Sequence, residues 1–204
     1  MLIKTVNNQR PFSYRRTWIA IGSNAVGFWG QPIDALKKVF RTLSELNVNV
    51  KAISDVYVTA PVGGGRQKDF LNVVAMVDAG VAPAALLRLL KRTERAAGRR
   101  QGRRWGPRPL DLDVLSSNAT IGRKGRRRIR GQIILPHPEI LLRAFVLIPL
   151  ADVAPCWWHP VAQRTARQLR HQPRLRGQIR QVRRLHGTAA LLLGGSGAGR
   201  VHVD

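Results

Sequence analysis

The sequence of 204 residues contains a single cysteine, Cys156. One cysteine excludes an intrachain disulfide framework and a zinc site built on paired cysteines, and it fits a reducing compartment. No apolar run approaches the roughly 18 residues that span a bilayer, which excludes an integral membrane protein. Residues 1–16 contain basic residues but no apolar core of a secretory signal. We therefore expect a cytoplasmic protein, with an acid-free transit segment as the alternative interpretation of residues 1–16.

Acidic residues are also scarce, because 35 lysines and arginines face 11 aspartates and glutamates, a formal charge of +24. The excess is uneven. Residues 1–98 hold 14 basic and 6 acidic residues, whereas residues 99–204 hold 21 and 5. It gathers in three segments, 99–108, 123–130 and the acid-free stretch 164–184. Such density favours solvated loops or a groove for an anionic ligand, and leaves nucleic acid, a membrane surface and a polyphosphate substrate all open.

Hydrophobic periodicity predicts an α+β protein. Apolar residues recur at helical spacing after Pro32 and again after Pro83, and short apolar or alternating runs lie before, between and after these segments. The predicted helices cover residues 32–46 and 83–98, and the predicted strands cover residues 18–22, 48–56, 70–77 and 110–115. The order βαββαβ is that of a ferredoxin-like sandwich. An apolar run at 145–150 is expected to add a strand, and a basic C-terminal extension follows.

Two carboxylates stand together in the segment Arg104-Trp-Gly-Pro-Arg-Pro-Leu-Asp-Leu-Asp113. On a strand, Asp111 and Asp113 face the same way, about 7 Å apart, while Leu110, Leu112 and Val114 point to the opposite face. Two acids on one face repel each other unless cations hold them. Mg²⁺ suits this arrangement, because it takes one or two carboxylates together with phosphate oxygens.

A simpler interpretation of the pair is an exposed strand whose acids form ion pairs with Arg104 and Arg108. The surrounding sequence favours the metal instead. The chain has few acids, two of them lie directly behind a Trp-Gly-Pro-Arg turn, and arginine grips phosphate oxygens bidentately.

The segment 104–113 resembles the signature of the 6-hydroxymethyl-7,8-dihydropterin pyrophosphokinase family. These folate-pathway transferases move the β,γ-diphosphate of ATP to a pterin alcohol. Four further blocks resemble family segments in the same order, so the resemblance covers residues 18 to 155; they are residues 19–24, 57–63, 69–72 and 135–145. The resemblance implies a ferredoxin-like fold, ATP as co-substrate and two Mg²⁺ ions.

The resemblance also implies roles for individual residues. Asp111 and Asp113 correspond to the metal ligands and, with Arg99 and Arg108, to the catalytic group. The implied ATP-binding residues are Glu94, Arg99, Arg104, Arg108 and His137. The implied pterin-binding residues are Thr59, Ala60, Val62, Phe70, Asn72 and Phe145. Without the resemblance, Phe70 and Phe145 would be interpreted as core residues, His137 as a turn residue and Glu94 as a member of a solvated ion pair.

On this basis the chain divides into an N-terminal arm (1–16), a pyrophosphokinase domain (17–169) and a basic, then Gly/Leu-rich tail (170–204) that we expect to be flexible. The partners expected are ATP and the pterin alcohol, with no membrane. The alternative is a pyrophosphokinase-like protein of reduced activity whose basic surface binds nucleic acid non-specifically. A third explanation for the charge is an arginine-rich background composition.

Overall fold

The structure is a computed structural model. It describes residues 15–61, 67–100, 102, 106–118, 133–179 and 181–194. The predicted site residues Val62 and Arg104 and the basic segment 123–130 lie outside these ranges. Within them, no helix combines the length and the apolar character needed to cross a membrane.

Up to residue 117 the elements come in the order expected, except that one predicted strand is divided in two. The strands are β1 (Arg15–Ser23), β2 (Val48–Ile53), β3 (Val56–Thr59), β4 (Phe70–Ala79), β5 (Asp111–Ser117), β6 (Trp158–His159), β7 (Arg164–Thr165) and β8 (Val182–Leu185). The helices are α1 (Pro32–Glu45), α2 (Pro83–Ala96), α3 (Ala144–Val153), α4 (Ala166–Leu169), α5 (Arg176–Ile179) and α6 (Thr188–Leu192), with short 3₁₀ turns at Ile140–Leu142 and Pro173–Leu175.

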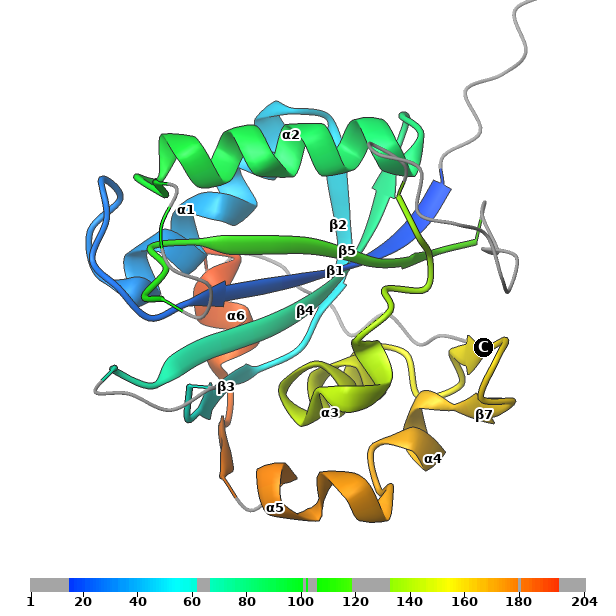
Figure 1. The fold of residues 1–204 in the computed structure, drawn as a ribbon. Coiled ribbons are helices and arrows are strands. Elements are labelled where there is room, and N and C mark those ends of the chain that lie inside the picture. Colours follow the sequence, from blue (N-terminus) through cyan, green and yellow to red (C-terminus); the bar gives the residue numbers. More distant parts are fainter. Residues whose placement is uncertain are drawn as a thin grey trace, which may run out of the picture.

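An antiparallel sheet forms the centre of the molecule. Its strands lie in the order β5-β1-β4-β3-β8, and β2 pairs with the other half of β4. Helices α1 and α2 cover one face, and α3 covers the other (Figure 1). The protein is therefore a mixed α/β fold with helices on both sides of the sheet.

The first core lies between the sheet and helices α1 and α2. Both helices begin with a proline, whose fixed φ suits the first helical turn. Their buried positions include Leu36, Val39 and Leu43 in α1 and Leu86 and Leu90 in α2, so the apolar stripes predicted from the 3.6-residue period face the core.

The strand predicted over residues 48–56 is two strands. Strand β2 pairs with the end of β4 at residues 75–79, and β3 pairs with its start at residues 70–72. Between them Ser54 is buried, and its hydroxyl accepts a hydrogen bond from the backbone N–H of Val74 at 3.1 Å. A polar side chain therefore replaces part of the ladder, which alternation alone did not reveal.

The prediction of a strand at residues 145–150 is wrong, because these residues lie in helix α3. The helix is apolar almost all round and contains Pro149, so its sequence has no period that separates a buried helix from a buried strand. It packs on the second face of the sheet with a core that includes Val74, Leu115 and Leu147.

The segment after residue 170, predicted as a tail, contains helix α5, strand β8 and helix α6 up to residue 192. Strand β8 pairs with β3 at the edge of the sheet, and α6 follows it. Leu185 and Leu192 pack against the first core. The pairing of β8 with β3 could not be predicted from local sequence, because Asp55, one ionic partner of Arg184, lies 129 residues earlier in the chain.

We expect the attachment of β8 and α6 to weaken in acid. Burial alone would raise the pKa of Asp55, but the N–H of Ala189 and the guanidinium of Arg184 hold that pKa below its ordinary value. A carboxylate with a lowered folded-state pKa stabilises the protein above its unfolded pKa, and this contribution is lost as pH falls.

Urea unfolding of wild type and Asp55→Asn at a series of pH values measures the effect. The difference in unfolding free energy should be largest near neutral pH and shrink below about pH 4. A difference that does not change with pH would contradict this assignment.

Candidate active site

The two aspartates of β5 point to the same face of the sheet, as predicted. Asp111 and Asp113 are partly exposed, while Leu112 and Val114 between and beyond them are buried in the first core. The two-residue period of a strand therefore anchors β5 on one side and presents two carboxylates on the other.

Strand register places Asp111 in one row with Asn72. Gly22 of β1 is opposite Asp111 on one side and opposite Asn72 of β4 on the other. A β-carbon at Gly22 would lie 3.2 Å from the Asn72 side-chain oxygen and 3.9 Å from the Asp111 Cβ. Glycine thus leaves the sheet surface open between the carboxylate and the amide.

A cavity of about 90 Å³ lies over this row. Phe70 and Phe145 form part of its wall and are half-buried, and Phe145 also packs against the second core. Asn72 donates a hydrogen bond to the Thr59 hydroxyl at 2.8 Å. The lining includes every described residue predicted for the pterin, together with Arg108 and both aspartates: Thr59, Ala60, Phe70, Asn72, Phe145, Arg108, Asp111 and Asp113.

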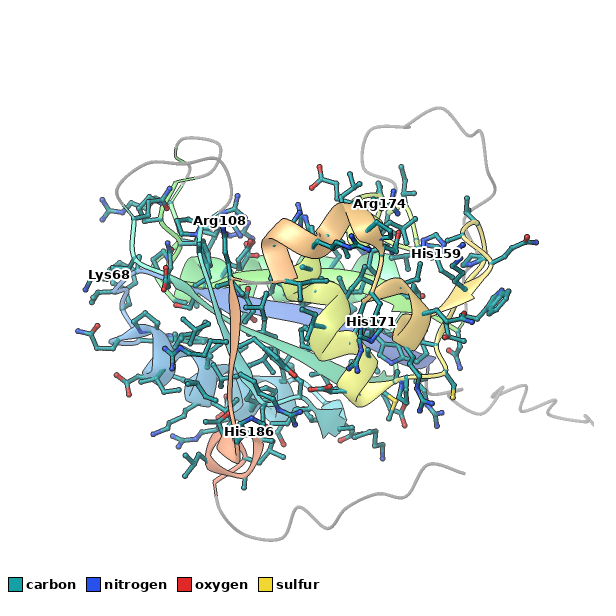
Figure 2. The ribbon with its side chains drawn as sticks, turned by 90° about the horizontal axis from the view of Figure 1, so that it is seen from below. Lys68, Arg108, His159, His171, Arg174 and His186 are labelled. Atoms are coloured by element: carbon teal, nitrogen blue, oxygen red, sulfur yellow. The ribbon has the colours of Figure 1, made fainter. Side chains whose placement is uncertain are left out.

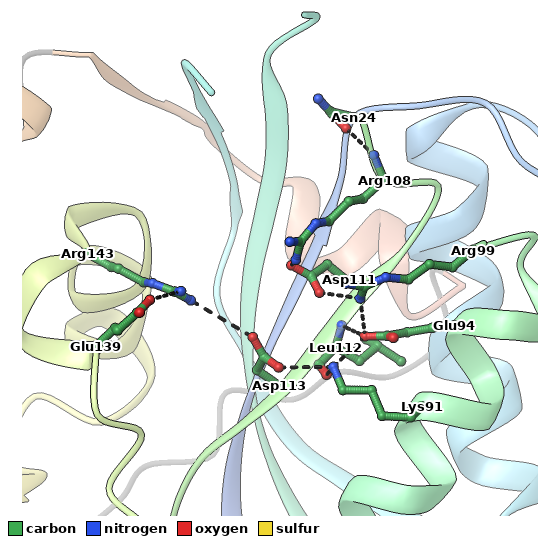
Figure 3. A network of polar contacts seen from close by, with 10 residues as sticks. All are labelled: Asn24, Lys91, Glu94, Arg99, Arg108, Asp111, Leu112, Asp113, Glu139 and Arg143. Atoms are coloured by element: carbon green, nitrogen blue, oxygen red, sulfur yellow. Dashed lines mark hydrogen bonds and ion pairs between the residues drawn. The ribbon is translucent and has the colours of Figure 1, made fainter. Parts of the chain in front are cut away.

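Arginines hold the first aspartate. Arg99 Nη1 lies 2.5 Å from Asp111 Oδ1, and Arg108 pairs with the other oxygen of the same carboxylate (Figure 3). Both oxygens of Asp111 are therefore ion-paired, and one of the two arginines, Arg108, is a partner that the simpler interpretation named. The partners are Arg99 and Arg108, and Arg104 lies outside the described residues.

Two further cations face Asp113. Lys91 Nζ lies 3.0 Å from Asp113 Oδ1, and Arg143 Nη1 lies 3.9 Å from Asp113 Oδ2. Burial alone would raise the pKa of Asp113, but the charges of Lys91, His137 and Arg143 lower it. Asp113 is thus ionised at neutral pH.

Glu94 is almost fully buried, with 3% of its surface exposed. Its Oε1 accepts hydrogen bonds from Lys91 at 2.7 Å and from the backbone N–H of Leu112 at 2.6 Å, and Arg99 lies 2.7 Å away. The carboxylate therefore ties α2 to β5 and orients two cations. A second groove beside the cavity is lined by Lys91, Glu94, Arg99, Arg100 and Arg108.

Asn24, just after β1, fixes the segment that carries Arg108. Its side-chain oxygen accepts a hydrogen bond from the Arg108 N–H at 2.7 Å, and its own N–H donates to the Arg108 carbonyl at 3.0 Å. Its amide nitrogen donates to the carbonyl of Lys68 at 3.0 Å. Figure 2 shows Lys68 and Arg108 at the same end of the molecule.

Sequence reasoning assigned no role to Asn24, Lys91 or Arg143. Lys91, three residues before Glu94 on the helix, was predicted only as a neighbour in its ion pair. Arg143 lies in the segment that resembles the family, two residues before Phe145. His137, predicted near the nucleotide, is partly buried near Asp113, and its backbone N–H donates to the carbonyl of Leu115 at 2.7 Å.

The donor set fits a magnesium ion bound together with a phosphate ligand. Two carboxylates on one face supply oxygen ligands, and phosphate oxygens would complete the coordination. The surrounding arginines suit the same ligand, because their planar forks match phosphate oxygens.

Comparisons with known proteins identify the family of this chain. A family model described as 7,8-dihydro-6-hydroxymethylpterin-pyrophosphokinase (HPPK) matches residues 18–155. The 2-amino-4-hydroxy-6-hydroxymethyldihydropteridine pyrophosphokinase of Pseudomonas aeruginosa is 38% identical over 141 residues, which are 69% of this chain and 82% of that protein. Its counterpart in Bacillus subtilis is 37% identical over 138 residues, 67% of this chain and 76% of that protein.

Among solved structures, a Plasmodium falciparum HPPK-DHPS crystallised with pterin and p-hydroxybenzoate has a TM-score of 0.62 at 15% identity. The similarity covers 84% of this chain and 47% of that one, so this chain spans about half of the Plasmodium protein. At this identity the likeness concerns the fold alone. Together with the family model, the relatives show that this chain belongs to the 7,8-dihydro-6-hydroxymethylpterin-pyrophosphokinase family.

Proposed function

We propose that this protein transfers diphosphate from ATP to 6-hydroxymethyl-7,8-dihydropterin, giving AMP and the pterin diphosphate in folate biosynthesis. The observation that carries the proposal is the row Asp111–Gly22–Asn72. It sets a carboxylate flanked by arginines beside a cavity with aromatic walls and an amide. Both the family and the relatives named as pyrophosphokinases support it.

The cavity is suited to the pterin. Phe70 and Phe145 offer ring faces to a flat heterocycle. Asn72 offers both a donor and an acceptor to a paired edge. Thr59 holds the Asn72 amide, and we assign the backbone of Ala60, with Val62 beyond it, to the same substrate.

The neighbouring groove is suited to ATP. Arg99 and Arg108 line it and would contact the phosphates, with Arg104 as a third cation. Glu94 contributes by holding Arg99 and Lys91, and His137 is assigned to the nucleotide. The groove shares Arg108 with the cavity, so the two substrates would meet at Asp111.

Asp111 and Asp113 would hold Mg²⁺, for which we propose two ions. When bound, magnesium offsets the negative charge of the phosphates. Both aspartates are partly exposed on the cavity side, and the lowered pKa of Asp113 keeps that carboxylate ionised at neutral pH. Arg99 and Arg108, which pair with Asp111, would find alternative partners in the phosphate oxygens.

In the proposed reaction, the pterin hydroxyl oxygen bonds to the β-phosphorus of ATP, and the bond from that phosphorus to the oxygen bridging the α- and β-phosphates breaks. AMP leaves, and the hydroxyl proton passes to water. Positioning and electrostatics supply the catalysis. Phe70, Asn72 and Phe145 orient the hydroxyl, and Arg99 and Arg108 neutralise the charge that builds on the phosphates.

We further propose that the fold has a ferredoxin-like framework. A ferredoxin-like framework is supported by the strand order, in which the first and third strands of the motif, β1 and β4, lie at the centre. We keep residues 17–169 as the pyrophosphokinase domain and add β8 and α6 to it.

A cytoplasmic location is supported by the use of ATP and by the single cysteine. The comparisons do not favour a nucleic-acid-binding function.

An assay of AMP formation tests the function. Purified protein is incubated with ATP and Mg²⁺, with and without 6-hydroxymethyl-7,8-dihydropterin, and nucleotides are separated by chromatography. We expect AMP in amounts equal to the pterin diphosphate, and only when the pterin is present. ADP as the product, or AMP formation independent of the pterin, would contradict the proposal. Salt-sensitive RNA binding without turnover would favour the alternative.

A further inference from the structure

Strand β8 lies beyond residues 18–155, the part of the chain that the family model matches. It joins the sheet beside β3, and its register continues the row of the active site. Arg184 is opposite Tyr57, and Tyr57 is opposite Asn72. The row thus runs across five strands from Asp111 to Arg184, all on the face that holds the cavity.

Arg184 connects three parts of the protein. Its Nε lies 2.9 Å from Asp55 Oδ2, and its Nη1 lies 3.5 Å from Asp152 Oδ2. The guanidinium also lies over the ring of Tyr57, 5.9 Å from the centroid. Asp55 immediately precedes β3 and Asp152 is near the end of α3, so one side chain bridges β8, β3 and α3.

Tyr57 makes the same connection from within the sheet. Its hydroxyl donates a hydrogen bond to Asp152 Oδ2, which joins β3 directly to α3. Both elements carry cavity residues, because Thr59 is two residues after Tyr57 and Phe145 is two helical turns before Asp152. The charged cluster therefore lies behind the two walls that we assign to the pterin.

Strand β3 needs support from an element other than β4. It has four residues, and only Tyr57, Val58 and Thr59 pair with β4. Short edge strands with few ladder bonds open readily. Strand β8 pairs with all four residues of β3, and the N–H of Val56 donates to the Thr188 hydroxyl at 2.8 Å.

We propose that residues 181–192 are a positioning clamp for the pterin pocket, with Arg184 as its central residue. Through Asp55, Tyr57 and Asp152, Arg184 sets the separation between the Thr59 and Phe145 walls. Neither Arg184 nor Tyr57 lines the cavity, so both act through other residues. The proposal rests on the proposed function, since it assigns the pocket to the pterin.

The test compares Arg184→Ala and Tyr57→Phe with Arg183→Ala. Arg183 is the matched control, because it is an exposed arginine on the same strand that faces the other side of the sheet. For each variant we would measure kcat, the KM for the pterin and the KM for ATP, with hydrogen exchange of residues 56–60 in the protein without substrates.

Displacement of the Thr59 or Phe145 wall should weaken binding of the pterin and leave binding of ATP nearly unchanged. We expect Arg184→Ala and Tyr57→Phe to raise the KM for the pterin about five- to tenfold, with the KM for ATP changed less than about twofold. The double variant should show less than the product of the two effects, because both act through Asp152. Exchange at residues 56–60 should be faster in Arg184→Ala, and Arg183→Ala should match wild type.

Two failures can be told apart. If wild type forms AMP with the pterin but Arg184→Ala changes neither KM, or both KM values equally, the clamp is overturned and the function stands. If wild type has no pterin-dependent activity, the proposed function fails and the clamp of the pterin pocket fails with it. Unchanged exchange at residues 56–60 in Arg184→Ala would overturn the clamp in either case.

Discussion

We expect Asp111→Asn to lower kcat about a thousandfold, a loss that corresponds to roughly 4 kcal/mol of transition-state stabilisation. The substitution removes the charge of a proposed magnesium ligand and leaves its shape nearly unchanged. It also leaves Arg99 and Arg108 without their shared carboxylate, so the charges around the phosphates are no longer balanced. Single-turnover measurements of AMP formation at saturating Mg²⁺ and both substrates check it.

Asp78→Asn is the matched control for this variant. Asp78 lies on strand β4 of the same sheet, its side chain is 21% exposed like that of Asp111, and it pairs with Lys51 at 3.8 Å. The same chemical change there should leave kcat within about twofold of wild type, since an exposed ion pair contributes little. Retention of more than about a tenth of the wild-type kcat by Asp111→Asn would argue against Asp111 as a metal ligand.

The parts of the site that the sequence predicted are those set by local geometry. Asp111 and Asp113 share a face because a strand has a two-residue period, and Leu112 between them is buried as that period requires. Helices α1 and α2 could be predicted because their apolar residues recur every three to four positions, which is also a local property of the chain. The roles assigned to Phe70, Asn72 and Phe145 came from the resemblance to the family, and the structure brings these side chains into one cavity.

The parts that could not be predicted depend on contacts distant in sequence. The row from Asp111 through Gly22 and Asn72 exists only once the register of three strands is set. The place of Arg184 depends on Asp55 and Asp152, which no spacing rule connects to it. A run of like charges predicts a solvated segment when read alone. Here the buried Asp55 and the partly buried Asp152 pair with Arg184 and hold this segment against the sheet.

Glu94→Gln is expected to lower the free energy of unfolding by about 3 kcal/mol, because it removes one partner from a buried ionic cluster. Glutamine can still accept the Leu112 N–H bond, but it cannot balance Lys91 and Arg99. The value is at the low end for such a change, since Asp113 and Asp111 remain as partners of the two cations. Urea denaturation followed by circular dichroism measures it.

The matched control is Glu45→Gln, at the exposed end of α1, which should change stability by less than about 0.5 kcal/mol. The comparison also separates two roles for Glu94. A residue that holds Arg99 in place loses stability and raises the KM for ATP together, because Arg99 keeps only Asp111 as an anchor. A residue that binds ATP directly raises the KM for ATP while the unfolding free energy stays near wild type. The three hydrogen-bonding and ionic partners of the buried Glu94 carboxylate favour the first outcome.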